Sequence, residues 1–594
     1  MNTQELGTPG EIAESGAEVS KAALEFMIAL GLNIIPGGPV VAAGLSFVGI
    51  TRKGVNLLRS TQEPNLEQWV AIAFPLAYIQ SFDTLVQTND WLQQKLQQIL
   101  QQKIDDELSS QEVRQQLNQL GEFQLDKDLA EEALTYFPES KLGQALNQQL
   151  SIYLQQKVRI QVPNNKYEIT PIVDNYTASI VTGWVAWGTH ECVKSLLKYE
   201  PENFVKSISL TIAAAQETRV TKKYSGIESY LKEQISPNPS NQVLLERWKV
   251  IGEEFKIPDI YVPLKAQLVD TNEKVNKQAA PNDLESWAKD QLTNPNKNGQ
   301  VMFIQGGPGR GKSVFCRMFA ECVRQHLHPI WTPVLIRLRD IHAFDPDIKK
   351  TLRAAVNADF AESDDGWLTD PNTRFLFLLD GFDELRMEGR TTKGIEEFLQ
   401  QVGNFQQNCQ QNPQLGHRFL VTGRESALQG IERFLPSNLE RVEISQMDDQ
   451  LQQQWFSKWK QLFDKNLLDQ KKDNAKAFQE FLQAQSCPKQ VQQLAKEPLL
   501  LYLLAAMHRD GQITDQMFKG VSSAQAKILI YQKTLDWVLT KQRSKDLNDD
   551  LTALETESLR RILAEAGLCV TQTGGEFTSI KHIEERLKFD GDAK

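Results

Sequence analysis

The sequence predicts a multidomain chain in which α-helical regions flank a central α/β domain with a parallel sheet. Its 594 residues exceed what one hydrophobic core usually supports, so we expect roughly three to five domains. Between residues 301 and 428, short apolar runs alternate with segments of helical apolar spacing, the pattern of parallel strands joined by right-handed helical crossovers. Most apolar residues outside that range have helical spacing.

The composition is that of a soluble globular protein without a nucleic-acid partner. Hydrophobic residues make up 41% and charged residues 24% of the chain, and the net charge of −11 argues against a basic nucleic-acid surface. The six cysteines are scattered without zinc-ligand spacing, which indicates reduced thiols in a cytoplasmic protein. No Lys or Arg precedes Lys21, so we expect no secretory signal.

Two helical regions are expected before the α/β domain. Residues 92–104 carry an apolar stripe at helical spacing in a Gln-rich background, and residues 175–197 form a longer apolar stretch. The prolines within 236–241 break the helical pattern. The prolines and β-branched residues of 257–264 favour extended backbone, and a polar stretch follows them.

Residues 26–50 form an apolar segment without a charged side chain. As one straight helix, residues 27–50 would be about 36 Å long, enough to span a bilayer core of about 30 Å. Pro36 and Pro39, with two glycines between them, favour a hairpin with two short arms instead. Three interpretations stay open: a hairpin buried in a helical domain, a hairpin released into a membrane on oligomerisation, or a resident membrane anchor. We expect no second segment able to span a membrane.

Residues 301–323 contain a phosphate-binding loop between a strand and a helix. Its sequence fits the pattern G-x-x-x-x-G-K-[ST]. Glycines let backbone N–H groups wrap phosphate oxygens at the positive end of the following helix. We expect Lys312 to neutralise the β- and γ-phosphates and the Ser313 hydroxyl to bind Mg²⁺. The loop residues predicted to bind the nucleotide are Gly306, Gly307, Pro308, Gly309, Arg310, Gly311, Lys312 and Ser313.

A second apolar run, residues 375–379, ends in Asp380 and is followed by Asp383 and Glu384. Because a fully apolar run is typical of a buried parallel strand, we expect Asp380 at the carboxyl edge of the sheet, where nucleotides bind. There it would hold Mg²⁺ through water. Either Asp383 or Glu384 is expected to orient or deprotonate the attacking water, and the sequence leaves open which.

Two further strands complete the predicted sheet. Residues 417–428 contain an apolar strand that ends in Thr422, Gly423 and Arg424, and residues 332–341 contain another. An arginine at a neighbouring strand tip can reach the γ-phosphate, so Arg424 joins the catalytic candidates. The alternative is an ordinary surface arginine.

These motifs together resemble the NACHT family of signalling NTPases. The resemblance rests on DGFDE after an apolar strand and on the TGR strand tip, and it covers residues 257–580. It implies an AAA+-like nucleotide-binding domain followed by a helical domain. It also implies that Pro498, in the segment 492–511, packs on the adenine, although the same proline suits the first turn of any helix. Residues 526–542 look like the start of a winged-helix domain.

The resulting division of the chain has six regions. They are an N-terminal helical effector region at 1–160 with the apolar hairpin 26–50, a second helical region at 161–256, a linker at 257–283, a NACHT nucleotide-binding domain at 284–430, a helical domain at 431–520 and an incomplete winged-helix domain at 521–594. The resemblance implies that an unknown trigger ligand is sensed by a C-terminal region absent from this sequence.

The resemblance implies a switch that binds ATP or ADP with Mg²⁺ and hydrolyses ATP slowly. An ADP-bound closed state would open on ATP binding and assemble into a homo-oligomer. The same resemblance implies a cytoplasmic protein of innate immunity or antiviral defence, including defence against phage. Its N-terminal effector is expected to act on a membrane or to cause cell death when activated. The alternative is an ordinary P-loop ATPase or kinase without oligomeric signalling. An integral membrane ATPase would need more membrane spans.

Overall fold

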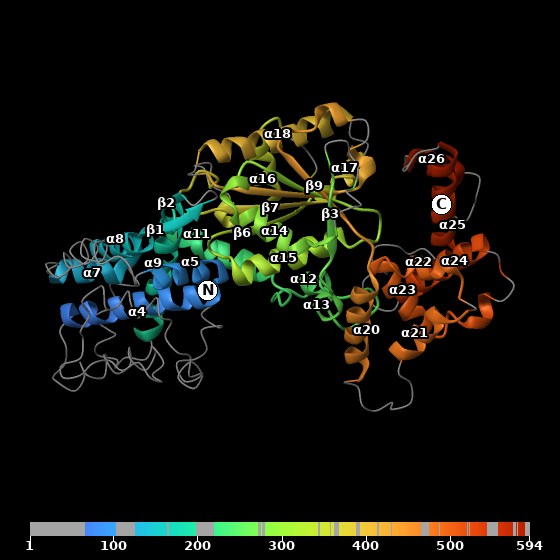
Figure 1. Ribbon diagram of the computed structural model, residues 1–594, viewed down its shortest axis with the longest axis horizontal. Helices are drawn as coiled ribbons and strands as arrows, with labels where there is room; N and C mark the ends of the chain where they lie inside the picture. The colour runs from blue at the N-terminus through green and yellow to red at the C-terminus, as the bar shows by residue number, and fades with distance from the viewer. Residues whose placement is uncertain are drawn as a thin grey trace.

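The structure is a computed structural model in which N-terminal helices, a central α/β domain and C-terminal helices follow one another (Figure 1). It describes residues 66–102, 125–162, 166–197, 219–270, 275, 280–341, 345–356, 358–361, 367–387, 392–412, 415–428, 431–464, 474–485, 487–518, 521, 523–542, 556–573, 578 and 580–587. The predicted hairpin at 26–50 lies outside these residues. The predicted class is confirmed: helices precede and follow a mixed sheet whose strands are mostly parallel.

The N-terminal part is a helical bundle centred on two apolar helices that pack along each other. A helix that is apolar on all sides must be buried, and α4 and α9 are both lined by buried side chains. Side-chain caps begin two of the shorter helices: Asp126 accepts from Leu129 N at α7, and Ser140 accepts from Gly143 N at α8. The elements are α4 (Leu66–Thr88), α5 (Asp90–Gln102), α7 (Lys127–Tyr136), η2 (Phe137–Glu139), α8 (Lys141–Leu154), α9 (Asn175–Leu197), α11 (Arg219–Tyr230), η3 (Leu231–Ile235) and α12 (Gln242–Glu246).

An antiparallel hairpin interrupts this helical part. Strands β1 (Lys157–Val162) and β2 (Lys166–Pro171) pair from Lys157 with Pro171 to Val162 with Lys166. It lies across the predicted boundary between residues 160 and 161, where the sequence predicts mostly helix. The alternation of polar and β-branched residues in KVRIQV is a short strand signal that the surrounding helical pattern obscures.

The central sheet has the strand order β4-β3-β9-β5-β8-β7-β6. The five strands from β9 to β6 are parallel, whereas β3 is antiparallel to both of its neighbours. The expected parallel sheet therefore carries an antiparallel edge. The strands are β3 (Lys265–Leu268), β4 (Asn282–Asp283), β5 (Val301–Gln305), β6 (Thr332–Arg337), β7 (Phe375–Asp380), β8 (Arg418–Gly423) and β9 (Leu439–Ile444).

Helices cover both faces of the sheet, which explains why β5 and β8 are buried along their whole length. Helix α15 packs against one face, and α16 and α18 pack against the other (Figure 1). The elements of this part are α13 (Ile257–Ile260), α14 (Leu284–Thr293), η4 (Pro295–Lys297), α15 (Lys312–His326), η5 (Leu338–Asp340), α16 (Ile348–Val356), η6 (Asp359–Ala361), α17 (Glu384–Met387), α18 (Thr392–Gln411), α19 (Glu425–Leu428) and η7 (Glu432–Phe434).

The C-terminal part is helical throughout its described residues. Its buried side chains form a hydrophobic core of their own, which also takes in Ile260 and Val262 from the segment before β3. The N-terminal bundle instead shares one continuous core with the α/β domain. The C-terminal elements are α20 (Asp449–Asp464), α21 (Asn474–Gln483), α22 (Lys489–Leu494), α23 (Pro498–Arg509), η8 (Asp515–Phe518), α24 (Ser523–Gln542), α25 (Thr556–Thr573) and α26 (Ile580–Leu587).

The sheet extends beyond the range 284–430 that the sequence suggested for its domain. Strand β3 comes from the expected linker 257–283, and β9 follows residue 430. Pairing of β3 with β9 covers a sheet edge that would otherwise be exposed. The segment 257–264, expected to be extended, begins with the short helix α13, because Pro258 occupies a first-turn position where its missing N–H is not needed.

One helix among the described residues is long and apolar enough to cross a membrane. It is the stretch Trp69–Thr88 of α4. In its most apolar 18-residue segment, 82% is buried inside the protein. The expectation that only residues 26–50 meet this test is therefore wrong. A core helix of a soluble protein passes the same test, and the packing of α4 against α9 indicates that role.

Candidate nucleotide site

The loop between β5 and α15 adopts a shape that its glycines permit. Gly309 and Gly311 have φ values of 76° and 89°, in the left-handed region that favours glycine. A Cβ on Gly311 would also lie 3.2 Å from Cδ1 of Leu264. Gly311 is the N-cap of α15, and no described side chain caps that helix. The N–H groups of its first turn are therefore available to an anion.

Lys312 reaches back over this loop. Its Nζ donates to the carbonyl oxygens of Gly306 at 2.7 Å and Gly307 at 3.2 Å. Burial lowers the pKa of Lys312, nearby carboxylates oppose this shift, and nearby guanidinium groups add to it. Phosphate oxygens in the loop would favour the charged ammonium, because opposite charge stabilises the ionised form.

Asp380 ends β7 and is separated from β5 by the intervening strand β8. Thr422 of β8 orients its carboxylate: Thr422 Oγ1 donates to Asp380 Oδ1 at 2.6 Å and accepts from the Gly381 N–H at 3.2 Å. A carboxylate held through one oxygen keeps its other oxygen for a cation or for the water around it. This geometry is compatible with the expected metal role of Asp380, which stays a prediction.

Asp383 and Arg424 form an ion pair. The Arg424 Nε lies 2.8 Å from Asp383 Oδ2, with the Asp383 side chain 12% exposed. Strand order explains the pairing, since both residues follow the carboxyl ends of the adjacent strands β7 and β8. A γ-phosphate that reached Arg424 would compete with Asp383 for the guanidinium group.

Glu384 has a longer ion-pair contact than Asp383. Its Oε2 lies 3.8 Å from the Nε of Arg339. Burial raises the pKa of Glu384, Arg339 opposes the shift, and the carboxylates of Asp380 and Asp383 add to it. A carboxylate with a raised pKa is a better proton acceptor near neutral pH. Gly381 has a φ of 88° and leaves room for the Glu384 side chain, because a Cβ on Gly381 would lie 3.1 Å from the Glu384 carboxyl group.

The C-terminal helical part touches the phosphate loop directly. The Leu499 N–H at the start of α23 donates to the Gly309 carbonyl at 3.2 Å. Arg310 adds a second link: its Nη1 lies 2.9 Å from Glu443 of β9, and its Nε lies 3.4 Å from Glu497. Glu497 precedes Pro498, the first residue of α23. The loop is therefore bonded to two parts of the protein at once.

These residues fit a nucleotide with Mg²⁺. The loop glycines and the first turn of α15 offer N–H donors, Lys312 offers an ammonium group, and Ser313 and Asp380 offer the hard oxygen ligands that Mg²⁺ prefers. Bound Mg²⁺ would supply charge neutralisation for the β- and γ-phosphates. No described contact tests where the adenine would lie, so its packing on Pro498 stays a prediction.

The sequence-predicted residues lie where the loop and the tips of β7 and β8 meet. Sequence reasoning missed three contributors: Thr422, Glu443 and Glu497. Thr422 lies within the TGR motif, and Glu497 directly precedes the proline that was singled out, so local signals existed for both. Glu443 has no local signal, because it meets Arg310 only after β9 pairs with β5.

Comparison with known families agrees with this architecture. Residues 300–462 match the NACHT domain, from the residue before β5 into α20, and residues 27–250 match NACHT N-terminal helical domain 3. No match was found among curated proteins. NACHT domains are STAND NTPases generally involved in signalling and defence, and they bind nucleotide, typically with Mg²⁺. With its strands, phosphate loop and acidic strand tip in this arrangement, the chain is a NACHT-domain NTPase.

Proposed function

We propose that this protein is an ATP-dependent signalling switch, closed with ADP and opened by ATP into a homo-oligomer that acts in antiviral defence. The observation that carries the proposal is the direct bond between the phosphate loop and α23, through Leu499 and Gly309. An exchange of ADP for ATP in the loop would therefore change a contact of the C-terminal helical part directly, with no other helix or strand between them.

Differential contacts supply the energy for such a switch. Moving an equilibrium between two states from about 1:100 to about 100:1 takes roughly 5.5 kcal/mol of difference in the ligand's affinity for the two states. Charge-assisted hydrogen bonds contribute about 1.5–3 kcal/mol each, so two or three γ-phosphate contacts suffice. Lys312, the Mg²⁺ site and Arg424 are the groups that would make them, with Arg424 leaving Asp383 to do so.

The first test is assembly as a function of nucleotide. Light scattering after size-exclusion chromatography should give a small species with ADP and Mg²⁺ and a large one with ATP and Mg²⁺. Lys312→Ala should weaken nucleotide binding at least about a hundredfold and abolish assembly, because the phosphates lose their main cation. Normal ATP affinity in Lys312→Ala would contradict the site. A constant small species with fast turnover would indicate an ordinary P-loop ATPase or kinase.

The second test separates the two acids after Asp380. Glu384→Gln should slow hydrolysis by about a hundredfold or more with binding unchanged, because it removes the proton acceptor, and the oligomer should persist. Asp383→Asn should also favour the oligomer, because it releases Arg424. In the unaltered protein, hydrolysis should fall as the pH drops through the raised pKa of Glu384, at a higher pH than an ordinary glutamate would give. Equal hydrolysis rates for Glu384→Gln and the unaltered protein would remove this role.

The effector proposal concerns the N-terminal region and a membrane partner. We propose that residues 26–50 of a cytoplasmic protein enter a membrane when many copies are brought together by ATP. Small residues such as Gly31 and Gly44 would let copies pack closely there. The ATP-bound oligomer should release dye from liposomes, and Gly44→Glu should not. No leakage from either protein would remove the membrane function and leave the nucleotide switch intact.

A further inference from the structure

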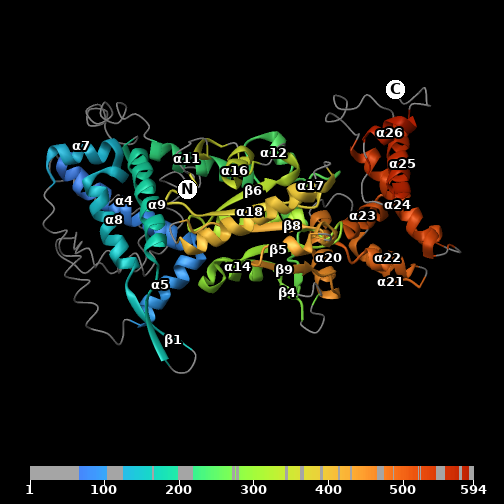
Figure 2. The same cartoon turned by 90° about the horizontal axis from the view of Figure 1, so that it is seen from above.

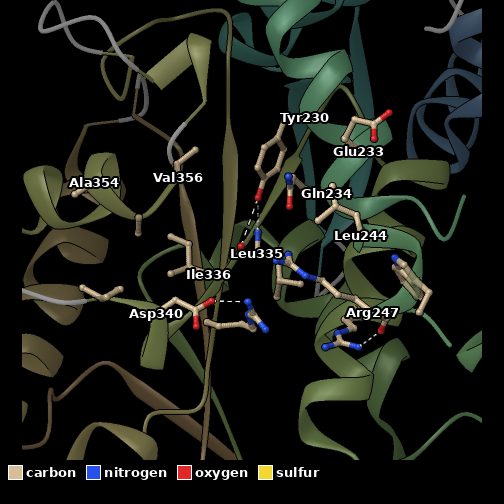
Figure 3. Close-up of a pocket in the computed structure, with 15 residues that line it drawn as sticks. Tyr230, Glu233, Gln234, Leu244, Arg247, Leu335, Ile336, Asp340, Ala354 and Val356 are labelled. Atoms are coloured by element: carbon tan, nitrogen blue, oxygen red, sulfur yellow. Dashed lines mark hydrogen bonds and ion pairs between the residues drawn. The ribbon is translucent and has the colours of Figure 1, made fainter. Parts of the chain in front are cut away.

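A cavity of about 280 Å³ lies between the N-terminal helices and the edge strand β6 (Figure 3). Residues of η3 and of the turn after α12 line one side, and residues of β6, η5, α15 and α16 line the others. Lys312, Ser313 and Asp380 are not among the lining residues, so the cavity is separate from the nucleotide site. Tyr230 fixes one wall, because its hydroxyl accepts from Leu335 N at 3.2 Å and donates to Leu335 O at 3.4 Å.

Two carboxylates and three guanidinium groups line this cavity, and both carboxylates are already engaged. Asp340 pairs with Arg337, whose Nη2 lies 2.6 Å from its Oδ2. The Glu233 carboxylate accepts the backbone N–H groups of Ser240 and Asn241, each at 3.1 Å. It therefore serves as a cap for the turn that precedes α12.

The other two arginines, Arg247 and Arg317, have no carboxylate partner within hydrogen-bonding distance among the described residues. Arg317 donates to the backbone carbonyl of Arg247. In the described part of the chain, the Arg247 guanidinium takes part in no hydrogen bond or ion pair. Burial lowers the pKa of Arg317, Asp380 opposes the shift, and the neighbouring arginines add to it. Two guanidinium groups that line one cavity favour an anion within it, and a dianion more than a monoanion.

The remaining lining is largely apolar. It includes Leu244, Trp248, Ile336, Ile341 and Val356. A cavity near the lower end of the usual range for small-molecule sites suits a compact organic body rather than a large cofactor. A phosphate monoester carries close to two negative charges near neutral pH and matches the planar fork of arginine. A carboxylate carries only one.

We propose that this cavity is a second ligand site, which binds a small phosphate monoester with an apolar or aromatic body through Arg247 and Arg317. Arg247 belongs to the region that matches the N-terminal helical domain, and Arg317 belongs to the NACHT domain. The ligand bridges the two domains. Its phosphate balances the two arginines, and its body lies against the apolar walls.

This site is built on elements that also form the nucleotide site. Arg317 follows Lys312 by little more than one turn of α15. On the other side, Arg337 of β6 is the register partner of Asp380 of β7. Occupancy of the cavity therefore biases two elements that position the nucleotide, and by linkage nucleotide binding changes the ligand's affinity by the same factor.

The test is titration of phenyl phosphate into the full chain loaded with ADP and Mg²⁺, followed by calorimetry. Phenyl phosphate should bind saturably without displacing ADP, benzoate should bind more weakly, and phenol should not bind. Arg247→Gln and Arg317→Gln should each weaken binding about tenfold or more, as loss of a charge-assisted contact does. Arg433→Gln, which removes an exposed arginine outside the cavity, is the matched control and should leave binding unchanged.

Ala354→Trp keeps both arginines but fills the cavity from an exposed lining position of α16, so it should block phenyl phosphate as well. Lys312→Ala should still bind the probe, which separates this site from the nucleotide switch. Absence of saturable binding would overturn the proposal. So would binding that survives both arginine substitutions, binding that survives Ala354→Trp, or binding that ADP displaces.

Discussion

The two helical parts flank the same α/β domain but are attached to it in different ways (Figure 2). The N-terminal bundle shares a continuous hydrophobic core with the sheet domain. The ring centroids of Trp184 in α9 and His328 are 4.6 Å apart, and those of Trp91 in α5 and Trp331 are 5.9 Å apart. The C-terminal helices have a core of their own. They meet the phosphate loop through a backbone bond and a partly exposed ion pair.

This difference indicates which part moves. Separating the N-terminal bundle from the sheet would expose aromatic side chains to water, and burial of each such side chain contributes about 1.5–3 kcal/mol. Releasing α23 from the loop breaks polar contacts that water can replace. We therefore expect the C-terminal helices to rotate when the nucleotide changes, while the N-terminal bundle stays with the sheet.

The largest expected effect comes from Trp184→Ala in the shared core. Truncating a buried aromatic side chain costs about 3–5 kcal/mol, and Trp184 is 5% exposed. Because its contacts join both parts, the N-terminal bundle and the sheet domain should unfold together at a lower temperature. Calorimetry combined with regional hydrogen exchange measures this.

Trp455→Ala is the matched control for that substitution. Trp455 is 3% exposed and stacks on Trp459 in the second core. Its loss should lower the protection of the C-terminal helices and leave the N-terminal bundle and the sheet unchanged. If Trp184→Ala destabilised only the N-terminal bundle or only the sheet domain, the two would not share one cooperative core.

Acid should act on the shared core through His417. Burial lowers the pKa of His417 to about 4, and the Leu368 carbonyl, 2.8 Å from its Nε2, opposes this shift. The Nδ1 of the neutral ring accepts from Phe375 N at 3.0 Å. The unfolded chain binds the proton first, at about pH 6.5. The contribution of neutral His417 is therefore complete above about pH 6.5 and is lost as the pH falls to about 4, a loss of about 3 kcal/mol.

The measurement is the free energy of unfolding by denaturant between pH 7 and pH 4. His417→Gln can make similar hydrogen bonds without titrating, so its stability should depend less on pH over this window. The same slope in both proteins would show that His417 does not control the acid response.

The smallest expected effect is at the contact between α23 and the loop. Glu497→Ala removes the partner of the Arg310 Nε, and both side chains are partly exposed, so a loss of about 0.5–1 kcal/mol is expected. The Leu499 amide, which bonds to Gly309, should then exchange several-fold faster while amides of the N-terminal bundle keep their rates. Lys476→Ala, in an exposed pair with Glu480, is the control and should change neither. Unchanged exchange at Leu499 would contradict the loose attachment of α23.

Local sequence patterns were sufficient for the central strands. The apolar runs at β5, β7 and β8 appear in the structure at the predicted positions, because a strand buried on both faces needs an unbroken run of apolar residues. Two-residue and four-residue strands carry no such pattern. Strand β3 forms because it pairs with the edge of β9, and β4 forms because it pairs with β3 in turn. No local pattern within residues 257–283 predicts this pairing.

The residues of the nucleotide site likewise fall into those that local sequence predicts and those that only the fold brings together. The phosphate loop, Lys312, Ser313 and Asp380 could be predicted from local sequence, because phosphate and Mg²⁺ chemistry demands particular residue types at fixed local spacing. The fold, and no local pattern, brings Arg424 to Asp383 and raises the pKa of Glu384. It also decided that Arg310 joins the loop to Glu443 and Glu497. Those contacts join residues far apart in the chain. The order in which the strands pair brings Arg424 to Asp383 and Glu443 to Arg310, and the packing of α23 on the loop brings Glu497 to Arg310.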